Sequence, residues 1–187
     1  SKLSDKGVAG FVMANGSMSS STGGEDKIRR ALIEKGLVEC MIALPSQLFF
    51  TVQIPACLWF IRKNRDRKET LFIDARNVGF MADRTHRDFS DEDIAKITAT
   101  YHNWRKKSPE YQDIKGFCKS ADVAEIAAND YVLTPGRYVG IEETETSKEE
   151  FETKMAALVA DLNAQMTKGA ELDAQIKSNL AMLGWKV

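Results

Sequence analysis

The sequence predicts an α/β fold that is followed by a helical C-terminal region. Two apolar runs of strand length, residues 38–44 and 56–61, do not alternate strictly between apolar and polar residues, which indicates strands covered on both faces. A third apolar run, 8–14, precedes a helical pattern and then the run 38–44, which is the order of a βαβ unit. From residue 148 onward, apolar residues recur at helical spacing instead.

The composition is that of a folded soluble domain. The chain has 187 residues, of which 43% are hydrophobic and 28% are charged, and this argues against a disordered segment. No apolar run approaches the length of a membrane span, and the N-terminal residues do not resemble a signal peptide. We therefore expect a cytoplasmic protein without membrane contact. The net charge of −1 argues against nucleic-acid binding through bulk charge.

The cysteine and histidine residues do not have the spacing of a metal site. Cys40, Cys57 and Cys118 lie far apart without a CxxC motif, and we expect buried free thiols. The two histidines, His86 and His102, have no paired ligands around them. The sequence therefore predicts no metal site.

The N-terminal elements predict parallel strands. The strand 8–14 ends at the turn signal Asn15-Gly16-Ser17. A helix over 25–35 follows, with acidic residues in its first turn, Gly36 placed to end it and one apolar face formed by Ile28, Ala31 and Leu32. Because this helix connects strand 8–14 to strand 38–44, we expect the two strands to be parallel with a right-handed crossover.

The connection 45–55 is too short for a crossover helix, so strand 56–61 is expected to run antiparallel and to finish the sheet as one reversed strand. A further strand is expected over 71–75. One helix does not cover both faces of such a sheet. We therefore expect further strands and helices before residue 1.

The middle of the chain is predicted to be helical. Ser90 and Asp93 have the spacing of a helix N-cap, and apolar residues at 94, 97, 101 and 104 share a face. A second short helix is expected over 120–128, and an ordered loop over 129–140. We expect three regions: 1–80, a helical connector 81–140, and a C-terminal helical region 141–187.

The C-terminal helix is expected over 148–183 and carries a long apolar stripe. Gly169 is its expected break. Such a stripe predicts either a helical hairpin or an arm that binds a partner.

Two segments carry candidate functional side chains. Phe49 and Phe50 lie in a connection where turn residues are usually small and polar, and they either pack on the core or form an aromatic platform. The run 62–68 holds five bases and one acid and is either a solvated loop or a phosphate contact, through Arg62, Lys63, Arg65, Arg67 and Lys68. The sequence has no GxGxxG, P-loop or GxSxG motif, so no catalytic residue is assigned in this chain.

Five phrases of the sequence, in order, resemble the modification subunit of type I restriction-modification systems, an adenine-N6 DNA methyltransferase. They are GFVMANGSMSS, ALPSQLFFTVQIPACLWFIRK, LFIDAR, DEDIAKITATYHNWR and YVLTPGRYVG. The resemblance implies a class I, Rossmann-like sheet that binds S-adenosylmethionine. The family's glycine-containing cofactor loop and its Asn/Asp-Pro-Pro-Phe/Tyr motif are not found here. The chain is therefore similar to the C-terminal part of that subunit, with no cofactor-binding residue of its own.

The resemblance also implies site residues and partners. An aromatic residue in the loop after the sixth strand stacks on the flipped adenine, and Phe49 matches it first and Phe50 second. Asn15 and Pro45 are expected at the rim of the site, beyond the carboxyl ends of the strands. The implied partners are DNA, the DNA-specificity subunit, which the C-terminal helices contact, and the restriction subunit.

Truncation of the sheet would leave the edge of strand 8–14 unpaired, and we expect this edge to promote self-association. Two alternatives remain open. One is a non-catalytic interaction module with a helical tail that binds a partner. The other is a related type IIG or solitary adenine methylase.

Overall fold

The computed structural model describes residues 3–50, 53–141 and 148–185. The chain divides into two compact units, Ser1–Glu142 and Glu143–Val187. The larger unit contains strands β1 (Val8–Ala14), β2 (Val38–Ala43), β3 (Ala56–Arg62), β4 (Thr70–Asp74), β5 (Phe80–Met81), β6 (Arg87–Asp88) and β7 (Cys118–Ala121), helices α1 (Glu25–Glu34), α2 (Asp91–Arg105), α3 (Val123–Ala128) and α4 (Gly136–Val139), and the 3-10 segments η1 (Asn15–Met18) and η2 (Thr22–Gly24).

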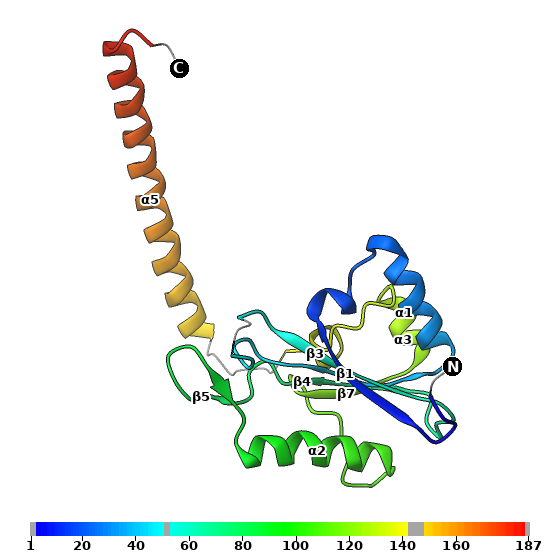
Figure 1. The fold of residues 1–187 in the computed structure, drawn as a ribbon. Helices are drawn as coiled ribbons and strands as arrows, with labels where there is room; N and C mark the ends of the chain where they lie inside the picture. Colours follow the sequence, from blue (N-terminus) through cyan, green and yellow to red (C-terminus); the bar gives the residue numbers. More distant parts are fainter. Residues whose placement is uncertain (1–2, 51–52, 142–147, 186–187) are drawn as a thin grey trace. The chain divides into compact units, whose positions relative to one another are not determined.

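A mixed sheet with the strand order β1-β3-β2-β4-β7 forms the centre of the larger unit (Figure 1). Strand β3 is antiparallel to both β1 and β2, β2 is parallel to β4, and β7 is antiparallel to β4. Strands β1 and β2 therefore point the same way, as the βαβ pattern predicted. The short strands β5 and β6 pair separately.

Two features of the sheet differ from the sequence prediction. The reversed strand β3 does not finish the sheet but lies inside it, between β1 and β2. Residues 118–121, part of which was expected to start a helix, form the edge strand β7 instead. The connector 81–140 thus supplies one strand of the sheet and belongs to the same compact unit as residues 1–80.

The central strands are buried on both faces, as their continuous apolar runs predicted. All six residues of β2 are buried. Met41 packs in one core cluster with residues from α1 and α3, whereas Cys40 and Ile42 pack in a second cluster with Trp104 of α2. This alternation follows from the two-residue period of a strand. It places α1 and α3 on one face of the sheet and α2 on the other, as Figure 1 shows.

The helix ends have the predicted chemistry. Ser90 and Asp93 form a capping box at the start of α2, with Ser90 Oγ accepting a hydrogen bond from the Asp93 amide at 3.2 Å. Gly36 follows α1 with φ of 63°, a left-handed conformation that glycine adopts without a steric penalty. Within α1 the predicted face does line one surface of the helix, but Ile28 is 61% exposed, whereas Arg29 and Ile33 are buried.

The loop predicted over 129–140 contains the short helix α4. Tyr138 of α4 stacks on Phe72 of β4, with ring centroids 3.8 Å apart and an interplanar angle of 8°. A Cβ atom at Gly136 would lie 2.5 Å from Nη2 of Arg76, so the flexible end of the Arg76 side chain would have to shift to admit it. The Pro-Gly turn thereby brings Tyr138 onto the central sheet.

The smaller unit is formed by helix α5 (Lys148–Met182), which is continuous through Gly169. The predicted break and the fold back into a hairpin are therefore wrong. A continuous helix of 35 residues is about 50 Å long. Its apolar stripe is exposed in this unit, at Phe151, Met155, Leu158, Leu162, Met166, Leu172 and Ile176.

All three cysteines are buried and free, as expected from their positions. In the parts of the chain that the structure describes, no helix combines the length and the apolar character that crossing a membrane requires.

Candidate functional site

The strands that run in one direction end side by side. The register aligns Ala14 of β1 with Ala56, Cys57 of β3 with Ala43 of β2, and Ala43 with Asp74 of β4. Adjacent strands lie about 5 Å apart, so the segments that follow β1, β2 and β4 emerge within roughly 15 Å of one another. This carboxyl edge is where open α/β sheets bind ligands.

The segment after β2 turns sharply at this edge. Pro45 is buried, and Gln47 has φ of 63°, which is unusual for a residue with a side chain. The Gln47 carbonyl accepts a hydrogen bond from the Arg87 amide at 2.9 Å, so strand β6 supports the turn. A residue in this conformation costs free energy and persists only where the surrounding structure stabilises it. Such residues are found most often at functional sites.

The turn presents two aromatic rings. Phe49 is 40% exposed and Phe50 is 86% exposed, so neither ring is a core residue. One face of Phe50 stacks on the imidazole of His86, with centroids 4.3 Å apart and an interplanar angle of 14°. The simpler expectation, that this loop only packs on the core, does not fit these exposures.

The Asn15 side chain at the end of β1 has an unusual environment. Its Oδ1 atom is buried and has no hydrogen-bond partner among the described residues. A buried carbonyl oxygen without a partner costs free energy, about 1–3 kcal/mol. Asn15 follows β1 and Pro45 lies two residues after the end of β2, so both predicted rim residues lie at the same end of the sheet.

Asp74, the strand-end carboxylate beside this edge, is engaged by Arg76. Arg76 Nη2 donates to Asp74 Oδ2 at 2.6 Å, and Nε donates to Oδ1 at 2.8 Å. This hydrogen bonding raises the pKa of Arg76. The carboxylate is therefore paired, which fits a structural role.

The basic run 62–68 lies at the other end of the sheet, where β3 ends and β4 begins. Strand β2 spans six residues, so the run is about 20 Å from the turn that carries Phe49. Arg62 pairs with Glu39, and Arg65 donates to the Gly36 carbonyl at 2.7 Å. The structure thus does not bring the basic run together with the aromatic pair.

His86 is the site residue that the sequence analysis assigned to no role. It lies in the connection between β5 and β6, and it reaches Phe50 only through the tertiary fold. No local motif marks it. Among the residues that the structure describes, no group of three or more His, Cys, Asp or Glu side chains could hold a metal ion.

Comparison with known proteins identifies the family. The model of the N-6 DNA methylase family matches residues 1–147. The chain is 54% identical over 185 residues to a type I restriction enzyme HindI methylase subunit of Haemophilus influenzae, which covers 98% of this chain and 42% of that relative. It is 38% identical to the MjaIX methylase subunit of Methanocaldococcus jannaschii, over 96% of this chain and 32% of the relative. The chain thus spans less than half the length of these relatives.

Solved structures agree with the family match. The methyltransferase subunit of a type I restriction-modification system from Streptococcus thermophilus superposes with a TM-score of 0.64 at 32% identity, over 73% of this chain and 27% of that chain. The M protein of the type I restriction enzyme EcoKI gives a TM-score of 0.56 over 88% of this chain and 41% of that chain, and at 17% identity it supports the fold alone. The family match covers most of the sequence, including the strands that end at the carboxyl edge, and the chain belongs to the N-6 DNA methylase family.

Proposed function

We propose that this chain is a C-terminal part of a type I restriction-modification methylase subunit, which transfers a methyl group from S-adenosylmethionine to adenine N6 in DNA. The observation that carries the proposal is 54% identity to the HindI methylase subunit along 98% of this chain. In this proposal, residues 1–80 are the C-terminal half of a Rossmann-like methyltransferase domain, 81–140 the connector and 141–187 the docking region, all in a cytoplasmic enzyme.

The role proposed for the carboxyl edge is to hold the target base. Extruding a base from a duplex costs a few kcal/mol of stacking and pairing, and an aromatic face restores about 1–3 kcal/mol of it. The exposure of Phe49 and Phe50 supports this role. We assign Phe49 the direct contact and Phe50 the second, with Asn15 and Pro45 at the rim.

The sequence contains no GxGxxG motif after a strand. We therefore propose that S-adenosylmethionine, which supplies the methyl group, is bound by other parts of the subunit. In this proposal the chain alone is inactive, and its own residues only stack and orient the base.

A substitution in the intact subunit tests the stacking role. Phe49→Ala should lower the methylation rate roughly 5- to 150-fold, because 1–3 kcal/mol of base stacking is lost. The affinity for S-adenosylmethionine, measured by calorimetry, should stay unchanged. Phe11→Ala is the matched control, since Phe11 is another phenylalanine, 38% exposed, and lies in the middle of β1, away from the strands that support the turn. Equal loss of methylation and cofactor binding would show that Phe49 only supports the fold.

The proposed partners follow from the exposed surfaces. We propose that the apolar stripe of α5 contacts the DNA-specificity subunit, because a solvent-exposed stripe of this length is stabilised by a partner. The restriction subunit completes the proposed complex. Arg62, Lys63, Arg65, Arg67 and Lys68 remain proposed contacts to DNA phosphates, and the unpaired edge of β1 remains a proposed site of self-association.

The same stripe on α5 favours a second candidate, a non-catalytic interaction module. The two candidates differ in the Phe49→Ala experiment. An interaction module would keep partner binding and would have no methylation to lose.

A further inference from the structure

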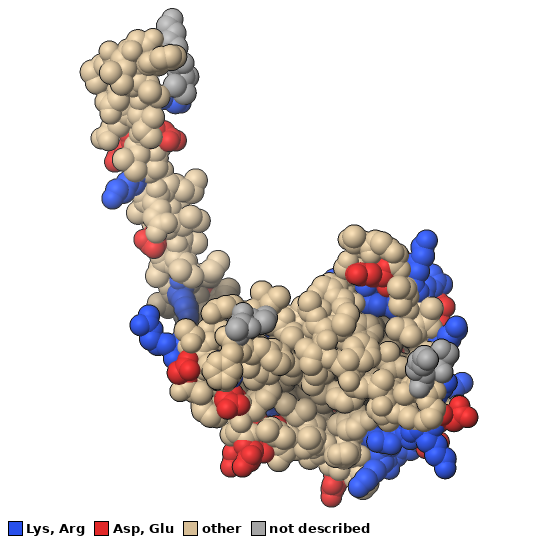
Figure 2. All heavy atoms as spheres, viewed as in Figure 1, with Lys and Arg blue, Asp and Glu red and all other residues tan. Residues whose placement is uncertain are grey.

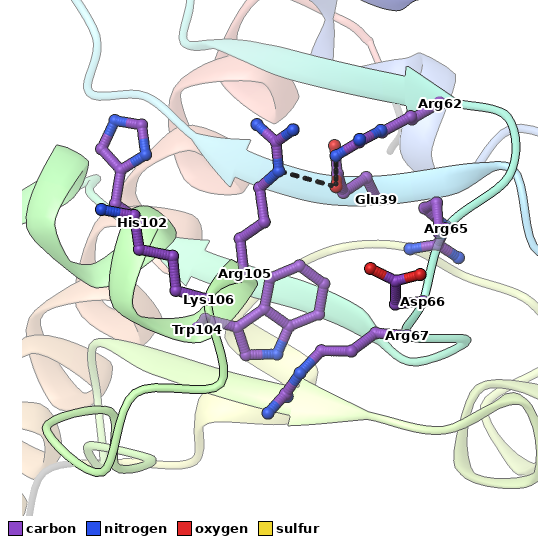
Figure 3. Close-up of a pocket in the computed structure, with 9 residues that line it drawn as sticks. All are labelled: Glu39, Arg62, Arg65, Asp66, Arg67, His102, Trp104, Arg105 and Lys106. Carbon is purple, nitrogen blue, oxygen red and sulfur yellow. Dashed lines mark hydrogen bonds and ion pairs between the residues drawn. The ribbon is translucent and has the colours of Figure 1, made fainter. Parts of the chain in front are cut away.

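A basic pocket of about 410 Å³ lies at the amino ends of β2 and β4, at the end of the sheet opposite to the turn that carries Phe49. The end of β3, the loop that follows it and the last turn of α2 form its walls (Figure 3). Figure 2 shows that Lys and Arg side chains gather on one side of this unit. The volume lies within the range of small-molecule sites, about 300–1,000 Å³.

Cations outnumber anions in the lining. Arg62, Arg65, Arg67, Arg105 and Lys106 face only two carboxylates, those of Glu39 and Asp66. Like charges held together in a partly enclosed space repel one another and raise the local positive potential. An anion inside the pocket would relieve this repulsion.

Glu39 holds part of the pocket in place. It is 2% exposed, and its Oε2 accepts a hydrogen bond from the Tyr101 hydroxyl at 2.9 Å. Its Oε1 lies 3.4 Å from Arg62 Nη1 and 3.8 Å from Arg105 Nε. Burial is the main cause and the hydrogen bond to Glu39 the second cause that raise the pKa of Tyr101 to about 12. The hydroxyl therefore keeps its proton at neutral pH and donates a hydrogen bond to Glu39. Two guanidinium groups are thus fixed by one carboxylate, as Figure 3 shows.

The other arginines are also held by the protein, but without carboxylates. Arg65 donates to the carbonyls of Gly36 and Glu69 at 2.7 and 2.9 Å. Arg67 lies over the ring of the buried Trp104, with 5.3 Å from Cζ to the ring centroid. Burial is the main cause that lowers the pKa of Arg65, and the charge of Arg62 acts in the same direction. These two side chains are therefore held in place without a ligand, although burial and the nearby charge of Arg62 disfavour the charged form of Arg65.

The protein does not satisfy all of these guanidinium groups. The Nε atoms of Arg62 and Arg67 are buried and have no hydrogen-bond partner among the described residues. Buried donors of charged groups are normally paired, because leaving them unpaired is costly. The lining therefore carries excess positive charge, and two of its guanidinium groups are not fully hydrogen-bonded within the described residues.

We propose that this pocket binds a small molecule that carries more than one phosphate group. Guanidinium groups match phosphate oxygens with paired hydrogen bonds, and several arginines fixed around one cavity suit a compact polyanion. The DNA-phosphate contact proposed above for Arg62, Arg65 and Arg67 competes with this occupant. The recessed position of Arg62, whose side chain is 22% exposed, favours the small molecule. The proposal is independent of the base-stacking role.

Calorimetry with inorganic pyrophosphate at about 0.15 M ionic strength, where attraction between charges more than about 8 Å apart is largely screened, tests the proposal on this chain. Arg67→Gln and Arg105→Gln should each weaken pyrophosphate binding about tenfold, the effect of losing one charge-assisted contact. Lys107→Gln is the matched control, because it removes one positive charge next to Lys106 but lies outside the lining. Its affinity should stay within about twofold of the parent chain, because long-range attraction is weaker than contact. Circular dichroism checks that each variant is folded. If Arg67→Gln does not fold, the affinity of Arg105→Gln for pyrophosphate decides the test.

Three results would overturn the proposal. The first is no pyrophosphate binding at millimolar concentration. The second is an equal loss in the Lys107→Gln control, which would indicate attraction by net charge alone. The third is a short DNA duplex that binds where pyrophosphate does not and is weakened by Arg67→Gln. That last result would assign the pocket to the DNA backbone instead.

Discussion

Glu39 shows how much one buried carboxylate determines at the basic end of the sheet. It is the second residue of β2, in a strand whose other residues are apolar or small, and it accepts contacts from β3 and from α2. Nothing in the local sequence marks it, because its partners Arg62, Tyr101 and Arg105 are distant in the chain. Residues of this kind are identified only from the tertiary fold.

Replacing Glu39 by Gln should destabilise the larger unit by about 1–3 kcal/mol, since the partly exposed Arg62 and Arg105 lose their charged hydrogen-bond partner. Urea unfolding followed by circular dichroism measures this change. Glu34→Gln is the control: this carboxylate pairs with Arg30 on an exposed surface, and its loss should destabilise the unit less than Glu39→Gln does. If both substitutions cost the same, the Glu39 pairs contribute no more than a surface ion pair.

The aromatic pair was predictable from the sequence, but its support was not. Two adjacent phenylalanines in a short connection suggested a platform or a packed loop, and the exposure of Phe50 excludes the packed loop for that ring. The stack of Phe50 on His86 and the strained turn at Gln47 depend on β5 and β6, short strands without a clear pattern. Local chemistry such as the Ser90 cap was correctly predicted because it needs only neighbouring residues.

At the scale of elements, strands with continuous apolar runs were predicted correctly, and the errors have a common cause. Residues 118–121, Cys-Lys-Ser-Ala, have weak strand character, and pairing with β4 determines their conformation. The position of β3 between β1 and β2 likewise depends on which strands pair, and the order of the strands in the chain does not determine this. Tertiary pairing outweighs propensity in both cases.

Helix α5 is continuous because a single glycine costs too little to break it. Glycine in a helix interior is less favourable than alanine by about 1 kcal/mol, which a long helix tolerates. A Cβ atom added at Gly169 would meet no heavy atom within 4 Å, so a methyl group at this position causes no clash.

Gly169→Ala should therefore stabilise α5 by about 1 kcal/mol and increase the helical signal in far-ultraviolet circular dichroism. Gly136→Ala is the contrasting substitution, because its Cβ atom would displace Arg76 from Asp74 and lower the stability of the larger unit. A loss of helical signal in Gly169→Ala would mean that the helix bends at this glycine.

At the scale of the whole molecule, the chain exposes two surfaces that proteins normally cover. One is the edge strand β1, where Phe11, Val12 and Met13 are 38%, 51% and 43% exposed. The other is the apolar stripe of α5. An edge strand offers unpaired backbone N–H and C=O groups, whereas a helix offers side chains only, so the two surfaces associate by different interactions.

Light scattering on two variants distinguishes these surfaces. Val12→Lys places a charge on the edge of β1 and should raise the concentration at which the chain self-associates by about tenfold or more, because a charged edge resists strand pairing. Leu158→Lys places the same charge on α5, where Leu158 is 57% exposed, and should leave association through the edge intact. If Leu158→Lys alone produces monomers, the helical stripe causes the association. A parent chain that is monomeric at all concentrations would contradict self-association through either surface.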